Sequence, residues 1–278
     1  MVLACAWLGA CAAAIDDLAD GVLVLPPELL EVSAITALDE RTLACVQDEA
    51  GALFLVDLLG QRPPRVAVFG EAGDYEGLAR VGDDYWVLRS DGLLLRLRSR
   101  DGGLDVASSH RLQTEHENWE GLCFDRDRGV LLILPKDRVG KGKEERGERS
   151  VFAVDPSTGT MQPEPVLQLN VTSLIEQAEV SGFDLPTKTT AKGKLRPPLK
   201  LLGSEILTVP GTDELLLLSA VDRALVRVDR AGRLLGLRLF DEDELSKPEG
   251  MAWLPDGRLL VASESTGGLG LVRVVTPP

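Results

Sequence analysis

The chain has 278 residues, 44% of them hydrophobic, which is enough for a large core and argues against a disordered protein. Its 44 acidic and 30 basic residues give a formal net charge of −14. A charge of this sign repels phosphate backbones and anionic lipid head groups, so it argues against nucleic-acid binding and against membrane binding through basic residues. Cations or basic protein surfaces are the favoured partners.

Residues 1–19 are predicted to be an export signal followed by an acidic tether. Their apolar run of about a dozen small residues is too short to span a bilayer but suits the apolar region of such a signal. The letters LGAC fit the pattern at which bacterial lipoproteins are acylated, which makes Cys11 the predicted lipidation site. No Lys or Arg precedes Cys11, which a longer N-terminus would explain. We therefore expect a protein of the periplasm or cell envelope, with lipid anchoring at Cys11; the alternative is an apolar terminus without a role.

Five similar units follow this segment. Each has a strand that opens with Ser or Glu, a Gly/Asp turn, a very apolar second strand and a third strand. The equivalent opening residues are Ser33, Glu76, Glu120, Ser204 and Glu249. Three of the four steps between them fit a propeller blade of roughly 40 to 50 residues, and the step from Glu120 to Ser204 is nearly twice as long. Because the long step holds no further pair of apolar strands, five blades are predicted.

We predict one folded domain over residues 20–278, with long insertions at 138–150 and 156–202. The first insertion is the charged stretch VGKGKEERGERS. The second contains a short helix, expected at residues 173–176 from a capping-box pattern, and the loop-like stretch LPTKTTAKGKLRPPLK.

The second strands, such as LLILP, LLLLS and LLVAS, are apolar throughout instead of alternating. This pattern is typical of strands that are covered on both faces, as they are between stacked blades. The last unit has only three strands, while the β-like run GVLVLPPELLEV precedes the first unit. Pairing of residues 21–26 with the last blade would leave no open seam. The predicted fold class is thus an all-β, monomeric five-bladed β-propeller of four-stranded antiparallel blades, closed by the N-terminal strand.

These repeats resemble the SdiA-regulated (YjiK-like) family, distant relatives of NHL-repeat propellers. The stretches that carry the resemblance are EVSAITALDERTLACVQDEAGALFLVDL, YEGLARVGDDYWVLRSD, WEGLCFDRDRGVLLILPKD, LLLLSAVDRALVRVD and PEGMAWLPDGRLLVASES. The resemblance covers roughly residues 28–275 and implies a five-bladed propeller, usually exported, with a calcium site and no established enzymatic activity. The chain departs from the family pattern in its two long loops and at GSEI of the fourth blade, where Glu205 replaces the usual Gly after Ser.

Inner strands of a propeller line the central channel, so Glu76, Glu120 and Glu249 are expected to converge on the axis, with Ser33 and Ser204 between them. Carboxylates at such close range need protons or a bound cation. Oxygen ligands suit Ca²⁺ better than Zn²⁺, and the resemblance implies the same ion, so these three glutamates are the predicted Ca²⁺ ligands. In the alternative, each Glu accepts backbone N–H bonds and ties neighbouring strands together. The Gly after each Glu is expected to permit close packing of the blades either way.

A second set of polar residues follows or ends the apolar second strands, and it either forms a ligand-binding rim or consists of solvated hairpin tips. Asp48 and Glu49 belong to it, and Lys136 is its obvious cation. The predicted ligand-binding residues are Ser33, Ser204, Glu205, Asp91, Lys136, Asp137, Asp222 and Glu264.

The two histidines, His110 and His116, form no recognisable triad with a nucleophile. Cys45 and Cys123 are expected to pack in the core, with a mutual disulfide as the alternative. The predicted function is that of an exported, calcium-binding propeller acting as a binding or scaffold module for a small ligand or protein partner. The alternative is a calcium-dependent hydrolase, of the lactonase or phosphoesterase type, that uses the channel carboxylates.

Overall fold

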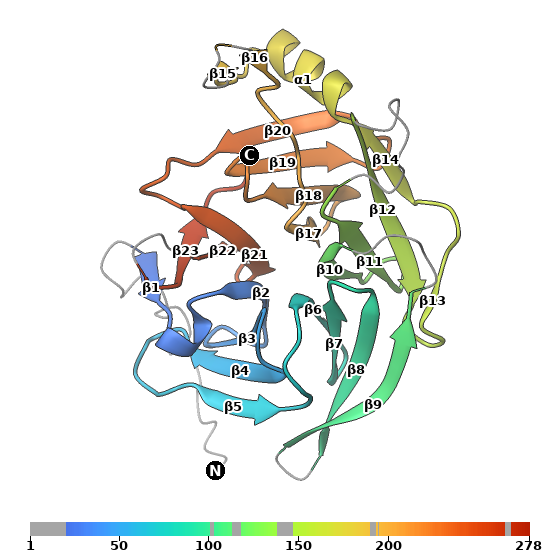
Figure 1. Ribbon diagram of the computed structural model, residues 1–278, viewed down its shortest axis with the longest axis vertical. Helices are drawn as coiled ribbons and strands as arrows, with labels where there is room; N and C mark the ends of the chain where they lie inside the picture. Colours follow the sequence, from blue (N-terminus) through green and yellow to red (C-terminus); the bar gives the residue numbers. More distant parts are fainter. Residues whose placement is uncertain are drawn as a thin grey trace, which may run out of the picture.

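The structure is a computed structural model, and it describes residues 21–100, 103–112, 118–137, 147–189, 193, 195–264 and 268–278. The predicted signal with Cys11, the histidine His116 and residues 138–146 of the first insertion lie outside the described residues. Five antiparallel sheets stand as blades around a common axis (Figure 1). The predicted five-bladed β-propeller is confirmed.

In the first four blades, chain order runs outward from the axis. The first blade contains β2 (Val32–Ala37), β3 (Thr42–Gln47), β4 (Ala52–Asp57) and β5 (Arg65–Val68). The second contains β6 (Tyr75–Val81), β7 (Asp84–Arg89), β8 (Leu93–Arg100) and β9 (Gly103–Arg111). The third contains β10 (Trp119–Asp125), β11 (Val130–Pro135), β12 (Glu148–Asp155) and β13 (Thr160–Met161), with β14 (Leu167–Asn170) also paired to β12. The fourth contains β17 (Glu205–Thr208), β18 (Glu214–Ser219), β19 (Ala224–Asp229) and β20 (Leu234–Leu239).

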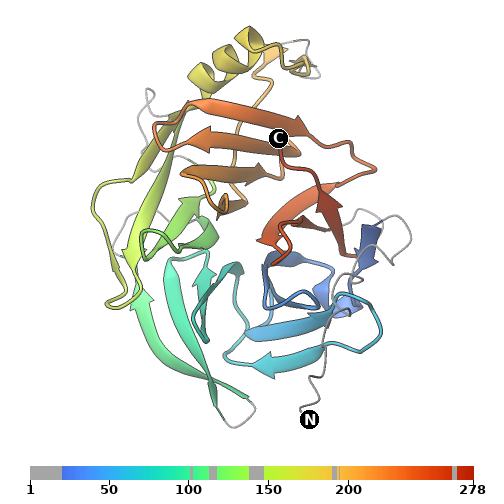
Figure 2. The same cartoon turned by 180° about the vertical axis from the view of Figure 1, so that it is seen from behind.

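The fifth blade combines both ends of the chain. Its three inner strands are β21 (Lys247–Trp253), β22 (Leu259–Glu264) and β23 (Leu271–Val275), and its outer strand is β1 (Val22–Val24). The pairing of β1 with β23 is antiparallel, and just beyond it the Leu25 backbone nitrogen donates to the Gly270 carbonyl at 2.8 Å. Figure 2 shows the same pairing from behind. The predicted closure of the ring by the N-terminal strand is therefore confirmed.

The core consists of apolar clusters that lie between neighbouring blades. On β11, Leu131 and Ile133 pack toward the second blade, whereas Leu132 and Leu134 pack toward the fourth. A 3-10 turn, η2 (Pro27–Leu29), places the fully buried Leu29 in the cluster between the fifth and first blades. Both faces of the second strands are thus covered, which explains their unbroken apolar runs.

Glycines after the opening glutamates let the inner strands approach closely. A Cβ on Gly77 would lie 2.6 Å from the Leu122 Cβ and 2.8 Å from the Glu120 carbonyl oxygen. A Cβ on Gly121 would meet the Ile206 nitrogen of the next blade at 2.9 Å. These contacts are shorter than real Cβ atoms make, so the blades could not pack this closely around any side chain there.

The second insertion contributes one helix, α1 (Val171–Val180), above the outer strands of the third and fourth blades (Figure 1). The Asn170 carboxamide oxygen caps it by accepting from the Ser173 nitrogen at 3.0 Å. The expected start at Ser173 is therefore wrong, because Asn170 provides the cap one turn earlier. Two short strands, β15 (Lys188–Thr189) and β16 (Leu195–Arg196), pair within the expected loop. Over the part of the chain that the structure describes, no helix is long and apolar enough to cross a membrane.

Candidate functional site

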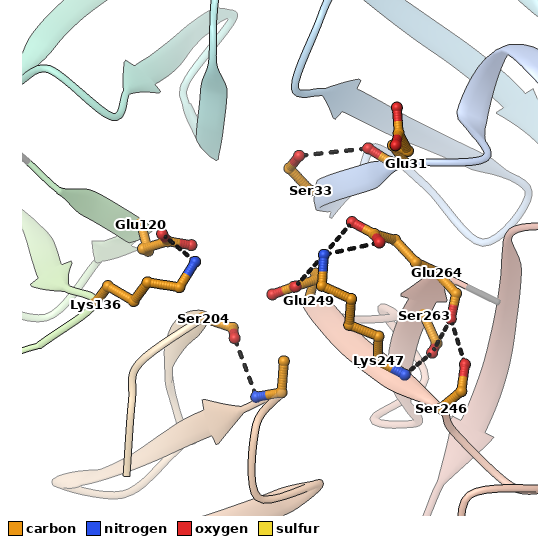
Figure 3. Close-up of polar contacts among 11 residues, drawn as sticks. Glu31, Ser33, Glu120, Lys136, Ser204, Ser246, Lys247, Glu249, Ser263 and Glu264 are labelled. Atoms are coloured by element: carbon orange, nitrogen blue, oxygen red, sulfur yellow. Dashed lines mark hydrogen bonds and ion pairs between the residues drawn. The ribbon is translucent and has the colours of Figure 1, made fainter. Parts of the chain in front are cut away.

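The opening residues of the inner strands and the last residues of the second strands lie at one end of the channel, because consecutive strands are antiparallel. We call this end the acidic mouth. Its described members are Ser33, Asp74, Glu76, Glu120, Lys136, Ser204, Glu205, Lys247, Glu249 and Glu264. Figure 3 shows Ser33, Glu120, Ser204 and Glu249 arriving from four different blades around the axis.

A β-bulge presents the opening residue in four of the blades. In the pairing of β6 with β7, Tyr75 and Gly77 have partners on β7 and the residue between them has none. In the pairing of β10 with β11, the same is true of the residue between Trp119 and Gly121. Glu76 and Glu120 are thus the unpaired residues, and Ser33 and Glu249 occupy the same place in the first and fifth blades. Because a bulge redirects the side chain of its extra residue, the repeated Glu-Gly sequence turns carboxylates toward the channel.

Glu120 forms an ion pair with Lys136, which follows β11. The Lys136 Nζ atom lies 2.7 Å from Glu120 Oε1, and the glutamate side chain is 3% exposed while that of the lysine is 41% exposed. Burial raises the pKa of Glu120 to about 7, although the Lys136 ammonium opposes this increase. The structure therefore brings one predicted rim residue to one predicted metal ligand.

Glu76 lies beside Asp74, on the same opening stretch of the second blade. Burial, followed by the nearby carboxylates of Glu120 and Asp74, raises the pKa of Glu76 to about 9. Asp74 in turn accepts a hydrogen bond from the Ser90 hydroxyl. At neutral pH the Glu76 carboxyl group therefore holds a proton, which relieves the repulsion between neighbouring acids.

Lys247 is the second cation of the acidic mouth. Its Nζ atom lies 2.8 Å from both carboxylate oxygens of Glu264 and 3.2 Å from Glu249 Oε1 (Figure 3). Burial raises the pKa of Glu264, and the Lys247 ammonium opposes this shift. Glu249 and Glu264, predicted separately as metal ligand and rim residue, thus share one lysine.

Glu205 lies where β6, β10 and β21 carry glycine and β2 carries Ala34, since it pairs with Leu218 as Gly121 pairs with Leu134. Its Oε1 atom accepts hydrogen bonds from the backbone nitrogens of Leu122 and Ile206, both at 2.9 Å. The residue is 1% exposed, and Oε2 is buried without a hydrogen-bond partner among the described residues. Burial raises the pKa of Glu205 well above its usual range, although the two N–H donors oppose the shift. Glu205 therefore has the strand-tying role considered for the opening glutamates.

Three other predicted rim residues make structural contacts. The Asp91 carboxylate pairs with Arg89 at 2.7 Å and with Arg111 at 3.2 Å. Asp137 Oδ1 lies 3.3 Å from Arg149 Nη1. Asp222 Oδ2 accepts from the backbone nitrogens of Lys200 and Leu201, at 3.0 and 2.7 Å, and from the Ser219 hydroxyl. Asp222 thereby fastens the end of the second insertion to the fourth blade.

The serines at the opening positions are buried and hydrogen-bonded locally. Ser33 donates to the Glu31 carbonyl at 3.4 Å, and Ser204 accepts from the Ala220 nitrogen at 3.1 Å (Figure 3). Among the described residues, no group of three or more carboxylate, imidazole or thiolate side chains is arranged as a ready-made metal site. A cation in the acidic mouth would therefore have to draw the glutamates together and displace the lysines.

Two members of the acidic mouth, Asp74 and Lys247, were not predicted. Both stand two residues before an opening glutamate, in DYEG and KPEG. Strand pairing could have located Lys247, because it lies opposite Glu264 in the register of β21 and β22.

The described cysteines and the described histidine are not part of the acidic mouth. Cys45 and Cys123 are buried free thiols, so core packing is confirmed and a mutual disulfide is excluded. His110 stacks on Trp86 with ring centroids 5.9 Å apart, and it lies on β9 at the outer edge of the second blade.

No protein-family model matches the sequence, and no curated protein matches it. Among solved structures, the chain is similar to the glutaminyl cyclase of Myxococcus xanthus, with a TM-score of 0.55 and 13% sequence identity over 92% of this chain and 97% of that one. Streptogramin B lyase gives a TM-score of 0.47 at 11% identity, over 88% of this chain and 94% of that one. The chain shares a propeller fold with the cyclase. Identity this low supports the fold alone.

Proposed function

We propose that this propeller is a binding module that takes a calcium ion at its acidic mouth. The observation that carries the proposal is an excess of buried carboxyl groups over cations. Glu120, Glu205 and Glu249 are 2%, 1% and 8% exposed, and Glu76 adjoins them. Among the described residues, only two lysines form ion pairs with these acids: Lys136 pairs with Glu120, and Lys247 pairs with both Glu249 and Glu264.

The chemistry of these groups favours a hard cation. Carboxylate oxygens are the ligands that Ca²⁺ prefers, at variable geometry and coordination number. Glu76 and Glu120 have raised pKa values because they are buried beside other acids, and a divalent cation would favour their ionised forms. Lys136 has a long and partly exposed side chain, which can leave Glu120 without disturbing the core.

Thermal unfolding in EDTA and in millimolar Ca²⁺ tests the proposal. Calcium at a hundredfold excess over Kd adds about 2.7 kcal/mol to the free energy of unfolding. For a chain of this size, this corresponds to an increase in Tm of several degrees, at about 2 °C per kcal/mol. Glu120→Gln should abolish the increase, whereas Glu28→Gln, at an exposed position of η2, should retain it. A wild-type Tm that does not respond to calcium would contradict the proposal.

Proton release gives a second measurement on the same protein. If calcium ionises Glu76 and Glu120, binding at pH 7 releases protons, and the apparent enthalpy in calorimetry changes with the ionisation enthalpy of the buffer. Mg²⁺ serves as the comparison, because it demands stricter octahedral geometry and is expected to bind more weakly. Calcium binding without proton release would locate the ion away from these two groups.

A calcium-dependent hydrolase is the second candidate, and the pKa of Glu120 favours it. A carboxyl group whose pKa is raised to about 7 by burial can both accept and donate a proton near neutral pH, as general acid–base catalysis requires. The glutaminyl cyclase from Myxococcus xanthus has an enzyme's name and the same fold, which is an analogy and not an assignment. Ester, lactone and phosphoester substrates should be screened with Ca²⁺ and then with EDTA. Calcium-dependent turnover that Glu120→Ala abolishes would establish the hydrolase over the binding module.

We also propose that the chain belongs to the SdiA-regulated (YjiK-like) family and that it is exported and acylated at Cys11. The repeats from Val32 to Val275 support the family, and LGAC supports the acylation. Metabolic labelling with a fatty acid in a bacterial host tests the anchor, because Cys11→Ser should abolish the label. Retention of the whole chain in the cytosol would contradict export.

A further inference from the structure

The end of the channel opposite the acidic mouth holds a cavity of about 370 Å³. It lies between the last residues of the five inner strands and the two hairpins that join β10 to β11 and β17 to β18. We call this cavity the arginine pocket. Its volume is within the range of small-molecule sites, which begins at roughly 300 Å³.

The wall of the arginine pocket nearest the channel is apolar. Its accessible apolar side chains are the half-buried Phe124, Leu207 and Val209, whereas Ile35, Leu78, Leu122 and Met251 behind them are only 0 to 2% exposed. Trp253 adds an indole ring, and its Nε1 atom donates to the Thr208 carbonyl at 3.0 Å, which fixes the ring across the fourth and fifth blades. This surface suits the hydrocarbon part of a ligand.

The outer part of the pocket carries more positive than negative charge. Its charged lining residues are three arginines and two aspartates: Arg80, Arg126, Arg230, Asp125 and Asp127. The chain as a whole has a formal net charge of −14. Asp83 and Asp213, just outside the lining, lie 3.9 Å from Arg80 and 3.4 Å from Arg230, so most of this positive charge is already paired and Arg126 is the group that favours an anionic ligand.

Two of the three guanidinium groups already have structural partners. Arg230 Nη2 lies 2.6 Å from Asp125 Oδ2 in the buried base of the hairpin. Arg80 donates to the carbonyl oxygens of Leu38 and Gly82, at 3.0 and 2.9 Å. Arg126 is exposed and makes no hydrogen bond or ion pair with any residue that the structure describes. Its five N–H donors are therefore open to an acid group of a ligand.

We propose that the arginine pocket binds a small amphipathic organic acid, with its acid group at Arg126 and its hydrocarbon body against the apolar wall. This site is separate from the acidic mouth and does not depend on calcium. Head-group charge selects the ligand, and the apolar wall supplies about half of the binding surface.

Three probes with the same hydrocarbon body and different head groups test this assignment: octanoate, octan-1-ol and octylammonium. Calorimetry measures binding, and a change in Trp253 fluorescence reports it, since Trp253 lines the pocket and the other described tryptophans, Trp86 and Trp119, do not. We expect octanoate to bind about fivefold more tightly than octan-1-ol, which is the upper end of the range for an exposed ion pair. Octylammonium should bind most weakly. Equal or tighter binding of octylammonium would overturn the assignment.

Two variants and a control locate the site. Arg126→Gln should reduce octanoate affinity by about fivefold and leave that of octan-1-ol unchanged, because it removes only the charge. Ala37→Phe, which fills part of the pocket, should weaken both probes. Arg62→Gln, at an exposed arginine of the first blade outside this pocket, should change neither. Octanoate binding that Arg126→Gln and Ala37→Phe both leave intact would show that the acid binds elsewhere.

Discussion

Glu205 Oε1 lies 2.9 Å from the Leu122 backbone nitrogen, so a carboxyl group of the fourth blade holds the inner strand of the third. The same oxygen accepts from the nitrogen of Ile206, on its own strand. Gly121 allows the two inner strands to pack closely at this interface, and the buried Glu205 side chain joins them by hydrogen bonds. The opening glutamates have a different role, because Glu120 and Glu249 pair with lysines in the acidic mouth.

Replacing Glu205 tests this link. Glu205→Ala leaves two buried N–H groups without their acceptor, and it should lower the free energy of unfolding by about 2 to 4 kcal/mol. Glu205→Gln keeps a carbonyl oxygen at nearly constant shape and should lose less than about 1 kcal/mol, because burial favours the uncharged form of the acid by raising its pKa. Urea denaturation at pH 7 measures both. Equal losses in the two variants would show that the charge, and not the acceptor, matters.

The fold could be predicted in detail because each blade repeats one local pattern. The Glu-Gly openings, the apolar second strands and the turn residues recur in register, so five weak signals reinforce one another. The β-like run before Ser33 predicted β1, because the last repeat has only three strands and its blade needs an outer strand to close the ring. The start of α1 was missed because two polar residues, Asn170 and Ser173, compete as caps, and only the backbone conformation distinguishes them.

The candidate site could be predicted only in part. Repeat spacing placed Glu120 and Glu249 at one end of the channel, and the bulges that turn them inward are a consequence of the same Glu-Gly sequence. The partner of each carboxylate was not predictable, because it depends on side-chain reach across strands. Lys136 and Glu120 are close only through the pairing of β10 with β11, and Glu205 meets Leu122 only across a blade interface.

The pH dependence of stability follows from Glu76 and Glu120. Their folded pKa values, about 9 and about 7, lie above the ordinary value of 4.5, because both are buried beside other acids. Both groups are protonated in the folded and unfolded states below about pH 4.5, so their contribution to the free energy of unfolding is complete there. It is lost as the pH rises, up to about pH 7 for Glu120 and about pH 9 for Glu76. For Glu120 the shift corresponds to on the order of 3 kcal/mol. Tm measured without calcium should fall between pH 5 and 9.

Variants identify the groups behind this pH dependence. Glu76→Gln cannot ionise, so it should flatten the decline in Tm, most clearly between pH 7 and 9. Glu179→Gln, at an exposed position of α1, should keep the wild-type profile. A Glu76→Gln profile that matches the wild type would assign the decline to other groups.

Lys136 should compete with calcium for Glu120. Lys136→Gln removes the ammonium that lies 2.7 Å from Glu120 Oε1, and it should lower the Tm in EDTA while enlarging the increase on calcium addition. Calorimetry should show tighter calcium binding by about tenfold or less, the range for one partly exposed ion pair. Lys136→Arg, which keeps the charge, is the matched control. A smaller calcium response in Lys136→Gln than in Lys136→Arg would contradict the competition.

The glycines of the inner strands should be intolerant of alanine. Gly77→Ala would place a Cβ 2.6 Å from that of Leu122, and overpacking of this kind typically costs about 1 to 3 kcal/mol. Gly103→Ala is the control, because its added Cβ would meet only the Arg100 carbonyl at 3.7 Å. Chemical denaturation should therefore separate the two variants by at least about 1 kcal/mol. Similar stabilities would mean that the interface between the second and third blades can relax.

Closure of the ring should depend on a few residues next to β1. Leu25 is 2% exposed and packs with Leu29 between the fifth and first blades, so Leu25→Ala should lower the free energy of unfolding by about 2 to 5 kcal/mol. Val24 is 56% exposed on the same segment, and Val24→Ala should cost less than about 1 kcal/mol. Hydrogen exchange locates the effect. In Leu25→Ala, the exchange rates of the β23 amides that pair with β1 should increase more than those of the β7 amides in the second blade. Exchange that accelerates equally in both strands would mean that the ring opens as one unit and has no separate seam at β1.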